Sequence, residues 1–96
     1  MKQVTLVSKE TFEIQEVPMA TYGPKQALLK VKAVGICGSD IHLFHGTYNG
    51  PHAYPMKFGH EWSGVVEATG ELVTSVKPGD LVTGDCSRFC GSCPAC

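Results

Sequence analysis

Three side chains in two short segments of the chain could bind one zinc ion. Cys37 opens the first segment, and His60 and Glu61 stand together in the second. Zinc binds thiolate sulfur, imidazole nitrogen and carboxylate oxygen, and a catalytic zinc site uses three protein ligands while one position stays open to water or substrate. Cys37, His60 and Glu61 therefore predict a catalytic zinc site.

The adjacent positions of His60 and Glu61 raise a geometric difficulty. Neighbouring side chains on a regular strand point to opposite faces, so both can reach one ion only where the backbone is irregular. Gly59 could supply that irregularity. Alternatively, Glu61 lies behind the site as an electrostatic partner, and the third ligand comes from residues after Cys96. The sequence leaves both alternatives open.

Residues close to Cys37 could support the metal. A ligating imidazole usually donates its second N–H to a carboxylate or carbonyl, and Asp40 is the candidate partner of the histidine ligand. Zinc lowers the pKa of a bound water or hydroxyl toward about 7, and Ser39 and His42 would then carry the proton outward. We therefore predict Ser39, Asp40 and His42 as catalytic residues. Each of these residues taken alone has an ordinary structural explanation, so only their combination with the three candidate ligands favours a metal site.

A second group of cysteines lies between residues 86 and 96. Cys90, Cys93 and Cys96 repeat the Cys-x-x-Cys spacing, which lets successive thiolates face one ion around tight turns. A closed structural zinc site needs four protein ligands. Either the chain is a fragment and the fourth ligand follows, which we expect, or Cys86 is recruited instead. A thiol redox sensor is a weaker third possibility.

Composition excludes several classes of function. The chain has 96 residues, of which 43% are hydrophobic and 18% charged, so we expect one compact domain with a core of its own. A net charge of -1 favours neither nucleic acid nor an anionic membrane as a partner. No segment approaches the roughly 20 apolar residues of a membrane span, and five cysteines fit a secreted disulfide framework poorly. We expect a cytoplasmic protein.

Hydrophobic alternation and turn residues predict a mostly β domain. A short helix is expected from an N-cap at Ser39 to about Phe44. Pro78 and Gly79 suit the centre of a type II turn, and residues 46–58 predict an irregular loop that borders a substrate. The predicted strands span residues 3–8, 11–17, 26–34, 61–68 and 81–83. Short strands joined by turns favour a Greek-key barrel or sandwich.

Four ordered motifs together resemble the N-terminal catalytic domain of zinc-dependent medium-chain alcohol dehydrogenases, over the full length of the chain. The motifs lie in residues 35–42, 59–67, 77–82 and 90–96. The resemblance implies a GroES-like, partly open Greek-key barrel with short helical segments. It also implies that residues 1–96 are a domain fragment that ends inside a structural-zinc lobe, residues 86–96. The chain contains no Gly-x-Gly-x-x-Gly, so the Rossmann domain that would bind NAD or NADP is expected downstream.

The same resemblance implies a zinc-dependent oxidoreductase. Hydride would pass from a secondary alcohol to the nicotinamide while Ser39 and His42 remove the hydroxyl proton. The residues around Cys37 are similar to those of sorbitol and other polyol dehydrogenases and of threonine dehydrogenases, so a small polyol or sugar-like alcohol is the expected substrate. The full-length protein is expected to be a homo-oligomer, and the 96 residues alone to be inactive. The alternative from another class is a non-catalytic, zinc-stabilised binding module.

Overall fold

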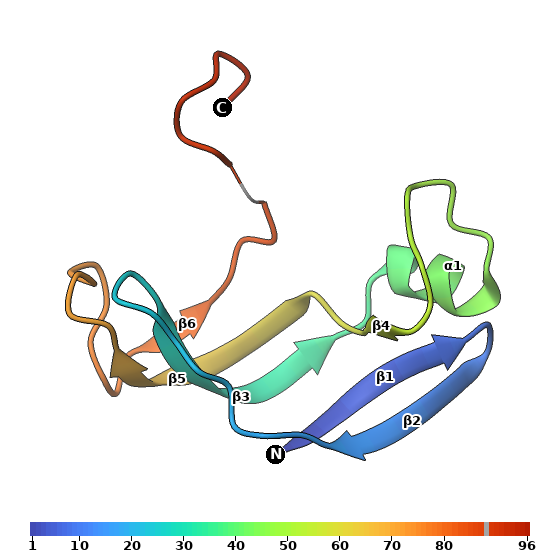
Figure 1. Ribbon diagram of the computed structural model, residues 1–96, viewed down its shortest axis with the longest axis horizontal. Coiled ribbons are helices and arrows are strands. Elements are labelled where there is room, and N and C mark those ends of the chain that lie inside the picture. The colour runs from blue at the N-terminus through green and yellow to red at the C-terminus, as the bar shows by residue number, and fades with distance from the viewer. Residues whose placement is uncertain (88) are drawn as a thin grey trace.

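The computed structural model describes residues 1–87 and 89–96. The described residues form six strands and one helix, α1 (Gly38–His45). Two antiparallel sheets of three strands lie side by side (Figure 1). The first sheet has the order β2-β1-β4, with β1 (Lys2–Ser8), β2 (Thr11–Glu16) and β4 (Met56–Lys57). The second has the order β3-β5-β6, with β3 (Ala27–Gly35), β5 (Glu61–Thr69) and β6 (Leu81–Thr83). The mostly β prediction is confirmed.

The β1–β2 hairpin forms where the alternating pattern predicted it. Its turn includes Glu10, which has a positive φ of 57°. The edge of β1 pairs with β4, so that Thr5 faces Lys57 and Leu6 faces Met56. Strand β4 lies inside the segment that was expected to be an irregular loop, and a two-residue strand is too short to show any alternation.

The longest ladder joins β3 to β5. It runs from the pair Ala27 and Thr69 to the pair Gly35 and Glu61. A Cβ atom on Gly64 would lie 2.6 Å from the carbonyl oxygen of Lys30, so the close approach of the two strands requires glycine there. Because the ladder ends at Gly35 and Glu61, the chain leaves β3 and enters β5 at the same end of the sheet.

The predicted turn before β6 is also present. The Asp80 N–H donates to the Lys77 carbonyl at 3.1 Å, and Gly79 has a φ of 94°, as the third residue of a type II turn requires. The Asp80 carboxylate accepts the Lys77 N–H at 3.0 Å. This hydrogen bond holds the pKa of Asp80 below its ordinary value.

The expectation of a core of its own is wrong. Among the described residues, only Leu6 and Val66 are buried apolar side chains. The domain measures 40 × 39 × 20 Å, and within residues 1–87 and 89–96 no second layer buries the faces of the two sheets. The apolar alternation of residues 26–34 is therefore half-buried at residues 27–29 and exposed beyond them: Val31 keeps 54% of its surface accessible, and Ile14 on the other sheet keeps 73%.

Beyond β6 the chain leaves the sheets. Figure 1 shows this segment, coloured red, extending away from both of them. Within residues 1–87 and 89–96, no helix has the length and apolar character needed to cross a membrane.

Candidate metal centres

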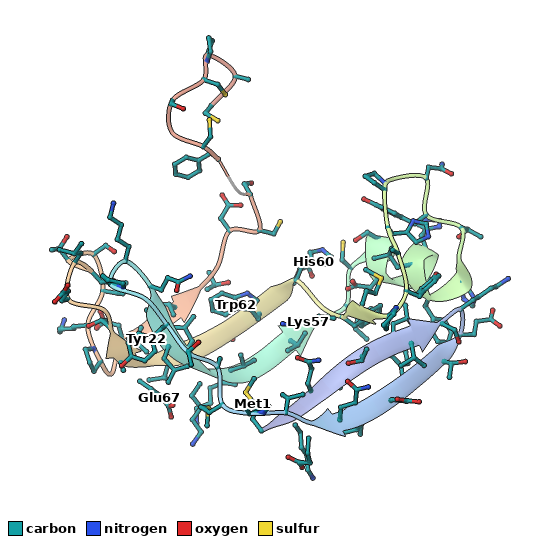
Figure 2. All side chains as sticks on the ribbon, in the orientation of Figure 1. Met1, Tyr22, Lys57, His60, Trp62 and Glu67 are labelled. Atoms are coloured by element: carbon teal, nitrogen blue, oxygen red, sulfur yellow. The ribbon has the colours of Figure 1, made fainter. Side chains whose placement is uncertain are left out.

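The first candidate centre lies at the end of the β3–β5 ladder. Cys37 follows β3, His60 precedes β5, and Glu61 is the first residue of β5. The Cys37 sulfur, one ring nitrogen of His60 and one carboxylate oxygen of Glu61 all lie within 4.8 Å of one another. Figure 2 shows His60 at the end of β5 that faces α1. The structure thus brings together the three residues that the sequence predicted as ligands.

The backbone at Gly59 accounts for the convergence of His60 and Glu61. Gly59 has a φ of 92°, a left-handed conformation that L side chains rarely adopt. His60 therefore lies outside the regular strand that begins at Glu61, and strict alternation does not apply to the pair. Direct binding of zinc by Glu61 stays a prediction.

Asp40 links the two halves of this centre. Its side chain is 2% exposed. One carboxylate oxygen accepts the Cys37 N–H at 2.9 Å, and the other lies 3.3 Å from Nδ1 of His60. The predicted pairing of Asp40 with the histidine is therefore present in the geometry. A single buried carboxylate contacts both the backbone at Cys37 and the imidazole of His60.

The predicted N-cap at Ser39 is wrong, because the cap of α1 is Cys37. The helix starts at Gly38, and Asp40, its third residue, reaches back to the Cys37 N–H. A carboxylate at this position satisfies an N–H that the helix itself leaves unpaired. Ser39 is consequently inside the first turn, where its hydroxyl interacts with the Cys37 thiol.

The electrostatics of the centre favour a thiolate. A hydrogen bond from the Ser39 hydroxyl is the main cause that lowers the pKa of Cys37, and His60 contributes in the same direction. The hydrogen bond with Cys37 raises the pKa of His60, and the charge of Asp40 adds to the effect. The thiolate is the form of cysteine that binds metals.

A hollow of about 340 Å³ lies beside this centre. Ser39 and His60 form part of its wall, and the segment between α1 and β4 forms another part, including Tyr48 and His52. This placement supports the expectation that residues 46–58 border a substrate. Cys86 also lines the hollow. Sequence reasoning did not predict that His52 and Cys86, both exposed, line a hollow, since irregular segments have no periodicity that would show which side chains face it.

His42 occupies a different position from Ser39. It is exposed, and its Nδ1 lies 2.9 Å from the Thr47 hydroxyl. Ser39 and His42 are three residues apart on α1, a spacing that places them on one side of a helix. Although they share this side, Ser39 lies in the wall of the hollow, whereas the His42 side chain is exposed to solvent.

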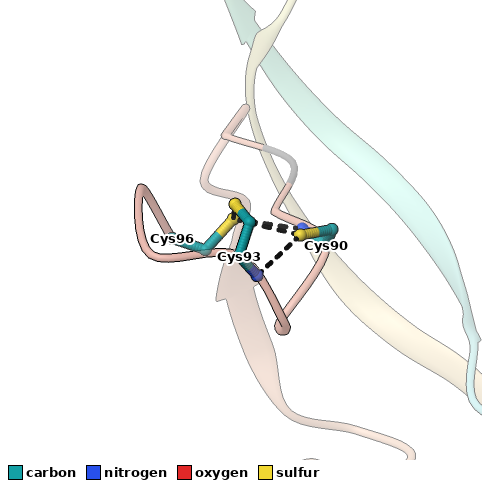
Figure 3. Close-up of side chains that lie close together, drawn as sticks. All are labelled: Cys90, Cys93 and Cys96. Carbon is teal, nitrogen blue, oxygen red and sulfur yellow. Dashed lines mark hydrogen bonds between the residues drawn. The ribbon is translucent and has the colours of Figure 1, made fainter.

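The second candidate centre lies in the segment after β6. The sulfur atoms of Cys90, Cys93 and Cys96 lie within 4.8 Å of one another. Figure 3 shows the three side chains grouped in one loop. The Ser92 hydroxyl, then the backbone N–H groups of Ser92 and Cys93, lower the pKa of Cys90 to about 6. Cys86 lies in the wall of the hollow instead, so the geometry does not support it as the fourth member of this group.

Fold and clusters together define a β domain with two candidate metal centres, one beside a hollow and one exposed. Residues 23–96 match the family model of the alcohol dehydrogenase GroES-like domain. The chain therefore belongs to this family, and the GroES-like fold expected from the sequence is confirmed.

Individual relatives agree with this assignment. The chain is 45% identical over 86 residues to a sorbitol dehydrogenase of Halalkalibacterium halodurans, covering 88% of this chain and 24% of the relative. It is 40% identical to a D-altritol 5-dehydrogenase of Agrobacterium fabrum, covering 100% of this chain and 28% of the relative. The crystal structure of galactitol-1-phosphate dehydrogenase from Escherichia coli superposes with a TM-score of 0.89 at 32% identity, covering 100% of this chain and 28% of that one. The chain thus spans about a quarter of the length of these relatives.

Proposed function

We propose that this chain is the zinc-binding catalytic domain of a dehydrogenase that transfers hydride from a secondary alcohol to NAD or NADP. A Rossmann domain outside these residues would bind the nicotinamide cofactor. The observation that carries the proposal is the convergence of Cys37, His60 and Glu61 within 4.8 Å, beside a hollow of about 340 Å³.

The donor set fits zinc. One sulfur, one imidazole nitrogen and one carboxylate oxygen are ordinary zinc ligands, and three of them leave a position for a further group. Bound zinc would supply a Lewis acid that lowers the pKa of an alcohol hydroxyl. Cys90, Cys93 and Cys96 would hold the structural zinc of the same protein, together with a fourth ligand.

The remaining residues of the centre would orient ligands and move a proton. Asp40 would keep His60 and the turn at Cys37 in place through its two carboxylate oxygens. Ser39, in the wall of the hollow, would accept the hydroxyl proton while passing its own proton on toward His42, and the His42 imidazole would release that proton to solvent. Removal of that proton leaves the carbon that bears the oxygen ready to release a hydride to the nicotinamide.

A polyol or sugar-like alcohol is the proposed substrate. The names of two similar proteins, sorbitol dehydrogenase and D-altritol 5-dehydrogenase, support this class. The alternative of a non-catalytic zinc module predicts a closed centre, whereas the hollow beside His60 and Ser39 favours an open one. Homo-oligomeric state and cytoplasmic location stay predictions.

The test uses the full-length, zinc-loaded protein. We expect reduction of NAD or NADP with D-sorbitol or another polyol, measured by absorbance of the reduced nicotinamide. Cys37→Ser should lose the central zinc and at least about a thousandfold in kcat/KM, since the Lewis acid is lost. The matched variant Cys86→Ser should keep its zinc content. A zinc-loaded full-length protein that reduces neither cofactor with any secondary alcohol would contradict the proposal.

A further inference from the structure

His52 is a histidine of the hollow for which neither metal binding nor proton transfer provides a role. The segment between α1 and β4 rises beside α1 in Figure 1. Its residue His52 lines the hollow that Ser39 and His60 also line. From the sequence alone, His52 was indistinguishable from any exposed histidine of a Gly- and Pro-rich loop.

One hydrogen bond fixes the tautomer of the His52 ring. Its Nδ1 lies 2.9 Å from the carbonyl oxygen of Gly50. A carbonyl oxygen only accepts, so in the neutral ring the proton is on Nδ1 and Nε2 carries a free lone pair. His52 therefore offers a hydrogen-bond acceptor.

Aromatic neighbours hold this ring in place. Tyr48 and Tyr54 each pack edge-on against His52, with ring centroids 5.8 Å and 5.7 Å away. The Tyr54 hydroxyl donates a hydrogen bond of 2.6 Å to the carbonyl oxygen of Leu43 in α1. Ser39 lies on the same helix, so the position of His52 is tied to the helix that carries the proposed proton acceptor. A binding group held in this way loses little conformational freedom when a ligand arrives.

We propose that Nε2 of His52 accepts a hydrogen bond from a second hydroxyl group of the substrate, which makes His52 a determinant of specificity for polyhydroxy alcohols. The inference rests on the proposed function and deepens it. The size of the hollow suits a small molecule, and the wall combines this acceptor with apolar side chains such as Leu43 and Met56. A simple alcohol has no group that would satisfy the acceptor.

The experiment compares two alcohols that differ by one hydroxyl group, 2,3-butanediol and 2-butanol, in the full-length, zinc-loaded protein. His52→Phe keeps an aromatic ring but removes the acceptor. We expect kcat/KM for the diol to fall about three- to tenfold, mainly through KM, because one neutral hydrogen bond is lost from ground state and transition state alike. The value for 2-butanol should change less than twofold.

Two further variants separate recognition from folding. His52→Gln restores an acceptor and should recover part of the preference for the diol. His45→Phe is the matched control, since His45 lies outside this hollow, in contact with Glu10. It should leave the ratio of the two kcat/KM values unchanged.

The outcomes are distinguishable. If the wild-type protein oxidises both alcohols and His52→Phe changes both to the same extent or neither, the inference about His52 is wrong while the proposed function stands. If the wild-type protein, tested also with D-sorbitol, oxidises no alcohol, the proposed function fails and the inference falls with it.

Discussion

At the scale of single residues, Asp40 has the greatest influence on the candidate active site. Among residues 1–87 and 89–96 it is the one buried carboxylate, and it contacts the backbone of Cys37 and the ring of His60 at once. A partner of this kind orients a metal ligand and increases its basicity. The geometry of the metal centre therefore depends on a residue that need not touch the metal.

Asp40→Ala is expected to weaken both the fold and the metal centre. The substitution leaves the Cys37 N–H without its acceptor and His60 without its charge partner, so we expect a loss of about 2–3 kcal/mol in the free energy of unfolding. Zinc affinity should fall about 10- to 100-fold. Denaturant unfolding and competition with a chelator measure the two effects in the full-length protein.

Asp85→Ala is the matched control for this prediction. Asp85 is exposed and accepts the Ser87 N–H at 2.8 Å. Its removal should change stability by less than about 0.5 kcal/mol and leave zinc retention unchanged. Equal effects of the two substitutions would show that Asp40 has no special role.

Residue types and spacing were sufficient to predict which side chains meet at the first centre. They predicted Cys37, His60 and Glu61 as one group and Asp40 as the partner of His60, because zinc ligands and their neighbours have characteristic chemistry. They did not predict the N-cap of α1. The Asp40 carboxylate, at the third residue of the helix, accepts the Cys37 N–H, so Cys37 and not Ser39 is the N-cap. Nor did they predict His52, whose place in the wall depends on long-range packing of a loop.

At the scale of elements, the β3–β5 ladder positions the ligands. Its last pair, Gly35 and Glu61, is immediately beside the first centre. The strand boundaries could be predicted to within about one or two residues, since turns at glycine and proline mark them. The two irregularities of register in the β3–β5 ladder could not, because a bulge depends on the partner strand and leaves no mark on the alternation of one strand.

Gly64→Ala is expected to strain this ladder. The added Cβ would lie 2.6 Å from the Lys30 carbonyl oxygen and 3.2 Å from the Val31 Cα. Backbone atoms cannot rotate away as a side chain can, so we expect a loss of about 1–3 kcal/mol in the free energy of unfolding. Weaker zinc retention should accompany it, because β3 and β5 carry the ligands.

The comparison for Gly64→Ala is Gly38→Ala, at the first residue of α1. A Cβ there meets nothing within 4 Å. This variant should stay within about 0.5 kcal/mol of the wild type, as judged by the denaturant midpoint. A Gly64→Ala protein as stable as the wild type would show that the strands can separate without cost.

At the scale of the whole molecule, the two candidate centres are structurally separate. The first centre lies at the end of the β3–β5 ladder, and the second lies in the segment that leaves the sheets after β6 (Figure 1). The sequence could predict both centres, but it could not predict how little apolar surface the sheets would bury. Composition measures how many apolar residues exist, whereas burial depends on whether a second layer covers them.

Cys93→Ser is expected to remove one metal and leave the other. Zinc content of the full-length protein should fall from about two ions to about one per chain, because a structural centre needs its four ligands. Its melting temperature should fall as well, since bound metal contributes to folding. Atomic absorption and calorimetry measure the two quantities, and simultaneous loss of both ions would contradict the independence of the centres.

The segment between α1 and β4 is inserted between the residues that would hold the metal, yet the β3–β5 ladder and not this segment fixes their separation. Changes in its length or composition can therefore alter the walls of the hollow without moving Cys37 or His60. A fold built in this way can acquire new substrates by small local steps while its chemistry is preserved. For protein engineering, randomisation confined to residues 48–53, which spares the Thr47 contact of His42, would sample selectivity at little risk to catalysis.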